Sequence, residues 1–375
     1  MKLTHALIFG LALVTGCGGT STPQPTGGGG TGGTAGGGAG GGGGGGTGGT
    51  GGADSPGGSW LTGQSATLLA SYDGATFTER TAPVTGDLYA LTCVGHLDGW
   101  AAGAKGAIIG THDGGITWTE ELSGVTTSLR ALSFADKDHG LAVGDAGVVL
   151  RTIDGGATWY RVSVATGADL RGVALSQFDG RAFVVGAGGI VLRSTDGGQS
   201  FGAPAQVTSS ELRAVRFSGE VGVGYAVGDG GLVLSTHDGS SWQPLASAPG
   251  NLTALSITDD ASRIVAVGNA GLVWRSTDSG ASWQAGASGV NAAINTIGFS
   301  DADEATGWAA GAHGTLLVTH DGGATFSSLA SPTTLDLYSV EEQDDFDGKN
   351  HPRRHTYTCG GIGTCTRLIE APRCI

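Results

Sequence analysis

Three arginines recur at one repeated position and have the clearest potential for chemistry. Arg130, Arg171 and Arg213 each follow a Leu at the start of a short apolar run, 41 and 42 residues apart. Three adjacent guanidinium groups can clamp a carboxylate or an acidic peptide through charge-assisted hydrogen bonds. The alternative, in which each arginine pairs with a nearby Asp, stays open. Other residues at the equivalent positions make any patch one-sided: Tyr89, Thr253, Asn295 and Tyr338.

Seven aspartates recur in a short motif, in which Gly, then Thr or Ser, then Trp or Phe follow the Asp. Successive Asp residues are 40, 41, 42, 42, 40 and 43 positions apart. Such an Asp accepts hydrogen bonds from backbone amides two or three residues ahead, Gly permits positive φ, and the hydroxyl braces the turn. Seven near-identical copies are too uniform for one active site, so we interpret them as structural turns. They are Asp73, Asp113, Asp154, Asp196, Asp238, Asp278 and Asp321.

Cys17 is the residue expected to be modified covalently. Lys2 opens a short basic region, and Ala6 to Val14 is apolar but too short to span a bilayer. The sequence Val14-Thr15-Gly16-Cys17 then resembles a bacterial lipobox, in which the thiol takes a diacylglyceryl group. We expect residues 1–16 to be a lipoprotein signal peptide. An ordinary secretory signal with a coincidental Cys is the alternative.

The chain after this Cys is of low complexity. Residues 18–58 are mostly Gly with Thr, Ala, Ser and Pro, and cannot bury enough apolar surface to offset chain entropy. Residues 17–58 are therefore expected to be the lipidated Cys and a disordered, flexible linker. The residue directly after Cys17 is Gly18 and not Asp, which is compatible with sorting to the outer membrane. We expect an exported protein that is lipid-anchored to the bacterial cell envelope, on the periplasmic face or the cell surface.

The recurrent residues require a repeated all-β unit to position them. Repeats of 40 to 43 residues match the length of a four-stranded propeller blade. Short apolar runs such as 129–134 and 140–144 predict strands buried between neighbouring blades. The first repeat lacks its opening strand, and residues 335–340 match the missing piece. We predict a seven-bladed β-propeller over residues 59–343 with one Asp-box per blade, closed by this C-terminal strand.

The Asp-boxes occur together with Gly-Trp-Ala-Ala-Gly at 99–103 and 307–311. This combination resembles the photosystem II stability and assembly factor-like propellers, a family with BNR/Asp-box repeats. The resemblance implies non-catalytic binding of another protein during assembly, with no cofactor. We therefore expect a membrane-tethered scaffold or assembly factor with a monomeric propeller, an envelope or secreted protein as partner, and membrane contact through the lipid alone. A surface adhesion or structural lipoprotein is the alternative.

Composition and missing motifs argue against other classes of protein. The formal net charge is -14, whereas nucleic-acid binding rewards clustered Lys and Arg. A sialidase-like hydrolase needs an arginine triad, and no Arg-Ile-Pro motif is present near the start of the propeller. A glucanase of the xyloglucanase type resembles two large propellers around a cleft. Repeats this short also leave no long loops for a substrate pocket, so no enzyme activity is expected.

Residues 344–375 are expected to form a Cys-containing C-terminal tail. The clustered Asp and Asn oxygens of residues 344–350 suit Ca²⁺, but their spacing does not match an EF-hand loop, so no metal site is predicted. An exported protein can form disulfides, and we favour a bridge from Cys359 to either Cys365 or Cys374. With Cys93 included, three pairings remain open.

Two further recurrent features are expected to be structural. Cys93 occupies the position that Phe134, Phe217 and Phe299 take in other repeats, and is expected to be a small buried hydrophobe. Three arginines precede their Asp-boxes and are expected to be exposed charges at strand ends: Arg151, Arg193 and Arg275.

Overall fold

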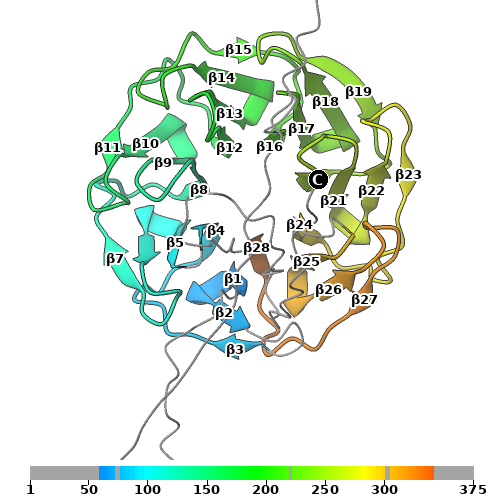
Figure 1. Ribbon diagram of the computed structural model, residues 1–375, viewed down its shortest axis with the longest axis horizontal. Helices are drawn as coiled ribbons and strands as arrows, with labels where there is room; N and C mark the ends of the chain where they lie inside the picture. The colour runs from blue at the N-terminus through cyan, green and yellow to red at the C-terminus, as the bar shows by residue number, and fades with distance from the viewer. Residues whose placement is uncertain (1–58, 72–76, 96, 219–221, 300–304, 342–375) are drawn as a thin grey trace, which may run out of the picture. The chain divides into compact units, whose positions relative to one another are not determined.

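The computed structural model describes residues 59–71, 77–95, 97–218, 222–299 and 305–341. Within them the chain forms seven four-stranded antiparallel sheets, arranged around a central channel as the blades of a β-propeller (Figure 1). The predicted all-β, seven-bladed fold is confirmed. Several residues singled out in the sequence lie outside the described part of the chain: Cys17, Asp73, Cys359, Cys365 and Cys374.

In each blade the strands are hydrogen-bonded in order from the channel outward, and the innermost is called the inner strand. Blade 1 consists of β28 (Leu337–Glu341), β1 (Ser59–Gly63), β2 (Leu68–Ser71) and β3 (Thr78–Glu79). Blade 2 consists of β4 (Leu88–Val94), β5 (Asp98–Gly103), β6 (Ile108–Thr111) and β7 (Thr119–Glu121). Blade 3 consists of β8 (Leu129–Phe134), β9 (Gly140–Gly144), β10 (Val148–Thr152) and β11 (Tyr160–Arg161).

The remaining blades follow the same plan. Blade 4 consists of β12 (Leu170–Leu175), β13 (Ala182–Gly186), β14 (Ile190–Ser194) and β15 (Ala205–Gln206). Blade 5 consists of β16 (Leu212–Phe217), β17 (Gly224–Gly228), β18 (Leu232–Thr236) and β19 (Gln243–Ser247). Blade 6 consists of β20 (Leu252–Ile257), β21 (Ile264–Gly268), β22 (Val273–Ser276) and β23 (Gln284–Ala285). Blade 7 consists of β24 (Ile294–Phe299), β25 (Gly307–Gly311), β26 (Leu316–Thr319) and β27 (Ser327–Ser328).

A short 3-10 turn joins the second and third strands of every blade. These turns are η1 (Gln64–Ala66), η2 (Ala104–Gly106), η3 (Asp145–Gly147), η4 (Ala187–Gly189), η5 (Asp229–Gly231), η6 (Asn269–Gly271) and η7 (Ala312–Gly314). Within the described residues, no helix has the length and apolar character needed to cross a membrane.

The propeller closes through its C-terminal strand, as the sequence predicted. β28 pairs antiparallel with β1, so that Leu61 faces Val340 and Thr62 faces Ser339. Figure 1 shows β28 beside β1 on the channel side of blade 1. The pairing completes the first blade and removes the exposed strand edge that an open ring would present.

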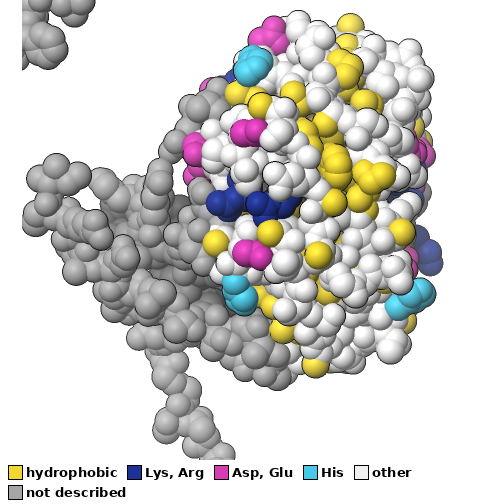
Figure 2. All heavy atoms as spheres, turned by 90° about the vertical axis from the view of Figure 1, so that its right-hand side faces the viewer, with side chains coloured by type: hydrophobic (Ala, Val, Ile, Leu, Met, Phe, Trp, Pro, Cys, Tyr) yellow, Lys and Arg dark blue, Asp and Glu magenta, His cyan; other side chains and the backbone are white. Residues whose placement is uncertain are grey.

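The hydrophobic core lies between blades. Each buried cluster combines side chains of two neighbours, as where Trp60 of β1 meets Trp118 of blade 2 with ring centroids 5.4 Å apart. The second strand of each blade is almost wholly buried, as in β9, β13 and β17. This burial explains the continuous apolar runs in the sequence. Burying each such Leu, Val or Trp contributes about 1.5–3 kcal/mol. By contrast, charged side chains are sparse on the side of the propeller seen in Figure 2.

Glycine ends the second strand of every blade because the inner strand passes very close there. A Cβ on Gly103 would lie 1.9 Å from the carbonyl oxygen of Asp87 and 2.9 Å from the Cα of Leu88. No side chain fits in that space. The equivalent glycines are Gly63, Gly144, Gly186, Gly228, Gly268 and Gly311.

Candidate binding site at the rim of the channel

A β-bulge near the start of every inner strand positions the residues that the sequence singled out. In blade 3, Leu129 pairs with Gly144 and Ala131 pairs with Val143, so Arg130 is skipped by the register. A bulge leaves the extra residue unpaired and redirects its side chain. We call the seven skipped residues the rim residues. They are Tyr89, Arg130, Arg171, Arg213, Thr253, Asn295 and Tyr338.

The rim residues and the Asp-boxes lie at opposite ends of the blades. Each rim residue is near the start of an inner strand, whereas each Asp-box follows the third strand of its blade. Successive strands are antiparallel, so the third strand runs in the same direction as the inner strand. The end of the third strand therefore lies at the opposite end of the blade from the start of the inner strand. The Asp-box amide of Gly114, for example, donates to the carbonyl of Leu97 in the loop after β4 at 3.0 Å. The structural turns are thus separated from the arginine row.

The rim arginines form an alternating chain with carboxylates. Nε and Nη2 of Arg130 donate to the two oxygens of Asp145 at 3.0 and 2.8 Å. Arg171 donates from Nη1 to the same Asp145 at 2.9 Å and from Nε to Glu211 at 3.1 Å. Its Nη2 donates to Asp169 at 3.1 Å. Arg171 therefore links the carboxylates of three neighbouring blades.

The chain continues to the third arginine. Nε of Arg213 donates to Asp229 at 2.7 Å, and its Nη1 lies 3.6 Å from Glu211. Three guanidinium groups thus face four carboxylates, and the pairing with nearby acidic residues that the sequence left open is present. Arg213 and Arg130 nevertheless keep 37% and 30% of their side chains exposed. The arginines are a row of oriented, partly exposed donors within a network that has one carboxylate more than it has guanidinium groups.

The carboxylates of this network also join neighbouring blades. Asp145 begins η3, and Asp169 immediately precedes β12 of the next blade, where its other oxygen accepts the amide of Ala146 at 2.9 Å. The Arg130 guanidinium holds the pKa of Asp145 below its ordinary value, so this carboxylate stays ionised at neutral pH. The network therefore fixes the orientation of the guanidinium planes.

Two tyrosines extend the arginine row on one side. The Cζ of Arg130 lies 4.4 Å from the ring centroid of Tyr89, a cation–π contact, and the Tyr89 and Tyr338 rings are 5.5 Å apart. Burial raises the pKa of both tyrosines. We call this contiguous stretch over blades 1 to 5 the arc. It consists of Tyr338, Tyr89, Arg130, Arg171 and Arg213.

The two other rim residues bond to the backbone of the neighbouring inner strand. Thr253 Oγ1 donates to the carbonyl of Ile294 at 2.6 Å, and Asn295 Nδ2 donates to the carbonyl of Leu337 at 2.9 Å. Their polar groups are used within the fold. The rim is accordingly asymmetric, with aromatic and charged side chains on one side of the channel.

The described Asp-boxes brace turns between the third and fourth strands. Asp113 accepts the amide of Thr117 at 2.9 Å, the hydroxyl of Thr117 at 2.6 Å and the hydroxyl of Thr111 at 2.8 Å. The amide that donates at 2.9 Å is four residues ahead, one residue further along the chain than the expected two or three. The second Gly lengthens the turn by one residue. Only the shorter copy at Asp238 among the described ones uses amides two and three residues ahead.

The longer geometry recurs in four more copies, at Asp154, Asp196, Asp278 and Asp321. Hydrogen bonds from the hydroxyl and amide of Ser200 lower the pKa of Asp196 to about 2. A carboxylate whose oxygens are occupied in this way is a poor candidate for proton transfer. The arrangement fits a structural turn.

Two expectations about recurrent residues were wrong. Arg151 and Arg275 are half-buried, and each donates to the Asp-box turn of the next blade. Arg151 Nε donates to the carbonyl of Gly197 at 2.8 Å, and Arg275 Nη1 donates to the carbonyl of Asp321 at 3.4 Å. Arg193 is exposed, as expected. Cys93 is half-buried rather than buried, because it lies near the end of β4 and lines the channel.

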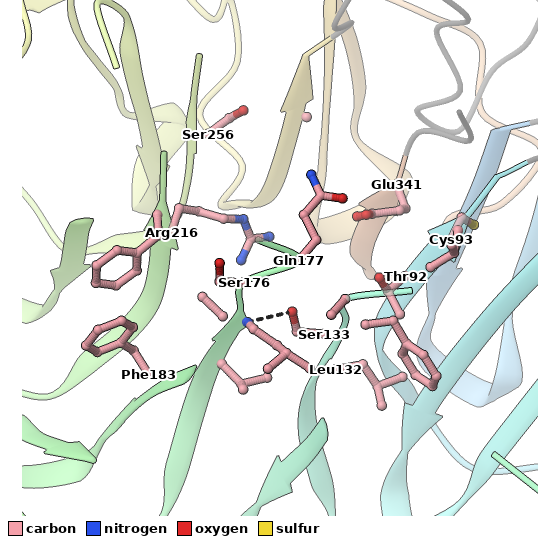
Figure 3. Close-up of a pocket in the computed structure, with 18 of the residues that line it drawn as sticks. Thr92, Cys93, Leu132, Ser133, Ser176, Gln177, Phe183, Arg216, Ser256 and Glu341 are labelled. Carbon is pink, nitrogen blue, oxygen red and sulfur yellow. Dashed lines mark hydrogen bonds between the residues drawn. The ribbon is translucent and has the colours of Figure 1, made fainter. Parts of the chain in front are cut away.

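The channel itself contains a cavity that sequence reasoning missed. Its volume is ≈ 630 Å³, and it is lined at the end opposite the rim by all seven inner strands and the loops after them (Figure 3). Among the described residues, no group of three or more His, Cys, Asp or Glu side chains is placed to hold a metal ion. The calcium candidate at 344–350 and the tail cysteines lie outside those residues.

Comparison with known proteins gives a family and a set of similar folds. A family model described as photosynthesis system II assembly factor YCF48 matches residues 80–167, 123–207 and 172–301, together more than half of the chain. No curated protein matches.

Solved structures with the same fold include a YCF48 bound to a D1 peptide, with 23% identity over 66% of this chain and 84% of that chain and a TM-score of 0.55. YCF48 from Cyanidioschyzon merolae is 21% identical over 68% of this chain and 88% of that chain, with a TM-score of 0.56. The GH74 xyloglucanase from Xanthomonas campestris is 14% identical over 73% of this chain and 47% of that chain, with a TM-score of 0.56. At these identities the likeness is one of fold alone.

Proposed function

The chain belongs to the family of the photosynthesis system II assembly factor YCF48, and from this premise we propose that its propeller is a non-catalytic protein-binding module. It acts as a scaffold or assembly factor in the cell envelope. The observation that carries the proposal is the arc, in which bulges present three guanidinium groups and two tyrosines side by side at one end of the channel.

The carboxylates around the arginines favour ligand binding because they hold the guanidinium groups in place. Asp145 and its neighbours hold the guanidinium planes of Arg130 and Arg171 in fixed orientations, so a partner does not have to order them on binding. A guanidinium has five N–H donors in a fixed fork, and the exposed N–H groups donate to a further carboxylate. We therefore propose an acidic segment of another protein as the ligand.

The carboxylates at the rim determine which interactions can hold the ligand. Because four carboxylates face the three arginines, recognition depends on short-range hydrogen bonds and ring contacts more than on long-range attraction. A protein partner is supported by the related fold solved with a D1 peptide. The partner of this chain is proposed only by its chemistry, as an acidic segment of an envelope or secreted protein.

Co-purification from the cell envelope tests this function. The Arg130→Gln/Arg171→Gln/Arg213→Gln triple variant should lose the co-purifying partner. A matched control, Lys137→Gln/Arg161→Gln/Arg193→Gln, removes the same charge from exposed side chains and should retain it. Thermal melts must show that both triples are folded. A partner captured equally by both triples would exclude the arc, and the absence of any partner would favour an adhesive or structural role.

We also propose that Cys17 carries a lipid that anchors the protein to the cell envelope, with the outer membrane as its location. The lipobox-like sequence supports this proposal. Cys17→Ser should abolish incorporation of a radiolabelled fatty acid and move the protein from the membrane fraction to the supernatant. Cys93→Ser serves as the control and should leave both unchanged. A labelled, membrane-bound Cys17→Ser protein would refute lipidation at this residue.

A hydrolase function ranks below binding. The xyloglucanase is similar in fold alone, at 14% identity, and the Asp-box carboxylates are occupied by turn hydrogen bonds. Purified protein is expected to give no turnover of xyloglucan or of fluorogenic sialosides. Turnover that co-elutes with the folded protein would reverse this ranking.

A further inference from the structure

The cavity at the end of the channel opposite the rim is lined by both apolar and polar side chains. Its carboxylates are those of Asp136, Asp179, Asp259 and Glu341, and its cations are Arg181 and Arg216. The fifth residue of each inner strand faces it, and Thr92, Ser133 and Ser256 occupy that position in β4, β8 and β20. Short side chains leave the channel open at this depth. Some are used within the fold, since Ser133 Oγ accepts the backbone amide of Leu175 at 3.0 Å (Figure 3).

Among these seven residues only Glu341 of β28 and Arg216 of β16 are charged, and the cation is Arg216. It occupies the fifth position of β16, is exposed, and extends its guanidinium into the cavity towards Ser176 and Gln177 (Figure 3). Its Nη1 donates to the carbonyl of Val215 at 3.2 Å. Within the described part of the chain, no carboxylate lies within ion-pair distance of it. The rim arginines and Arg181, in contrast, are each paired with an acid.

Further polar groups surround the guanidinium. Ser176 and Gln177 follow β12, and Ser256 lies in β20, so hydroxyl and amide donors from two elements line the same space. Glu341 of β28 lies on the opposite wall (Figure 3). Charge-assisted hydrogen bonds gain strength in such a partly enclosed site, where the effective dielectric constant is below that of water.

We propose that this cavity binds a carboxylate, held by Arg216 with hydrogen bonds from Gln177 and the nearby serines. The cavity volume of ≈ 630 Å³ falls within the range of small-molecule sites, roughly 300–1,000 Å³. Glu341 limits the site to ligands whose second charged group, if any, is not negative. The site is separate from the arc, so a protein partner at the rim and a carboxylate in the channel bind independently.

Calorimetric titration of the purified full-length protein tests the proposal. The probes are N-acetylglycine and an N-acetylated hexapeptide ending in a free carboxylate, each with its uncharged amide counterpart. Saturable binding of both acids indicates a small-acid site, and binding of the peptide alone indicates a chain terminus; either result supports the carboxylate site. Equal binding of the amide counterparts, or no saturable binding of either acid, overturns it.

Variants assign the binding to Arg216. Arg216→Gln should weaken the affinity for the acids about tenfold or more, as expected for loss of a charge-assisted hydrogen bond. Arg216→Lys should retain part of the affinity, and Glu341→Gln should raise it by removing a like charge. The control Arg193→Gln changes an exposed arginine of the outer part of blade 4 and should bind as the wild type does. Unchanged affinity in Arg216→Gln would overturn the proposal.

Discussion

Glu121 is a carboxylate held between blades 2 and 3. Trp159 Nε1 donates to its Oε2 at 3.0 Å, and glycines make room for it, since a Cβ on Gly110 or Gly156 would lie 2.2 Å from a Glu121 oxygen. Burial raises the pKa of Glu121 above its ordinary value of 4.5. The folded state therefore holds this proton more tightly than the unfolded chain does. Its contribution to stability is present at low pH and is lost as the pH rises above about 4.5.

Glu121→Gln should remove this pH dependence. The amide keeps an oxygen acceptor for the Trp159 indole but carries no charge to desolvate. Relative to the wild type, the variant should gain about 1–3 °C in melting temperature between pH 4 and pH 7. The neighbouring Glu120 is exposed, and Glu120→Gln serves as the control. Parallel pH profiles for the wild type and Glu121→Gln would show that burial of Glu121 does not affect stability.

Some residues of the candidate site could be predicted from the sequence, and others could not. The recurrence of Leu-Arg in three repeats identified Arg130, Arg171 and Arg213 as equivalent. Their partners, such as Asp145 and Glu211, come from turns and strand starts of different blades, and only the packing of blades brings them together. Arg216 lacked any repeat signal, because the other inner strands carry different residues at that position.

Among the elements, the second strand and the inner strand constrain each other most tightly. Gly103→Ala would place a methyl group 1.9 Å from the Asp87 carbonyl oxygen and force β4 and β5 apart. We expect a loss of about 3 kcal/mol in the free energy of unfolding, from overpacking. Gly167→Ala meets nothing within 4 Å and should stay within about 0.5 kcal/mol of the wild type. Urea unfolding of the two variants measures the difference, and similar midpoints would contradict the close approach.

The closing strand can be tested by truncation. β28 supplies the inner strand of blade 1 and buries Leu337 and Val340 against blades 1 and 7. Deletion of residues 335–375 should abolish cooperative unfolding, whereas deletion of 344–375 alone leaves β28 in place and should preserve it. Scanning calorimetry distinguishes the two. A cooperative transition at the wild-type temperature after the longer deletion would mean that β28 does not close the ring.

The order and number of the strands could be predicted because period, apolar runs and turn residues agree in every repeat. The bulges could not, because nothing in the sequence distinguishes a residue skipped by the strand register from its paired neighbours. The hydrogen bonds of the Asp-boxes also required the structure, since the length of the turn decides which amide reaches the carboxylate. Bulges matter most for function, because they direct the rim residues.

At the level of the whole propeller, the repeated Asp-boxes predict a steep response to acid. Turn hydrogen bonds lower the pKa of Asp196 to about 2, and the pKa values of the other described Asp-box carboxylates are lowered as well. The folded state thus binds these protons less tightly than the unfolded chain. The associated stability is present above the ordinary pKa of 3.8 and is lost as the pH falls towards 2.

Melting temperature should therefore fall steeply between pH 4 and pH 2, with net uptake of several protons on unfolding. Asp196→Asn removes one of these groups and should make the fall less steep, although the variant starts from a lower stability at neutral pH. Circular dichroism melts across this range give the slope. A melting temperature that does not change between pH 4 and pH 2 would show that the turns do not depend on ionised Asp.

The most direct test of the proposed function is the affinity of the propeller for a defined acidic peptide. Fluorescence anisotropy of a labelled peptide rich in Asp and Glu, compared with its Asn and Gln counterpart, measures recognition of carboxylates without the cell. We expect only the acidic peptide to bind. Its affinity should fall about tenfold or more in Arg130→Gln/Arg171→Gln/Arg213→Gln and stay unchanged in Lys137→Gln/Arg161→Gln/Arg193→Gln. Equal affinity of the two triple variants would contradict it.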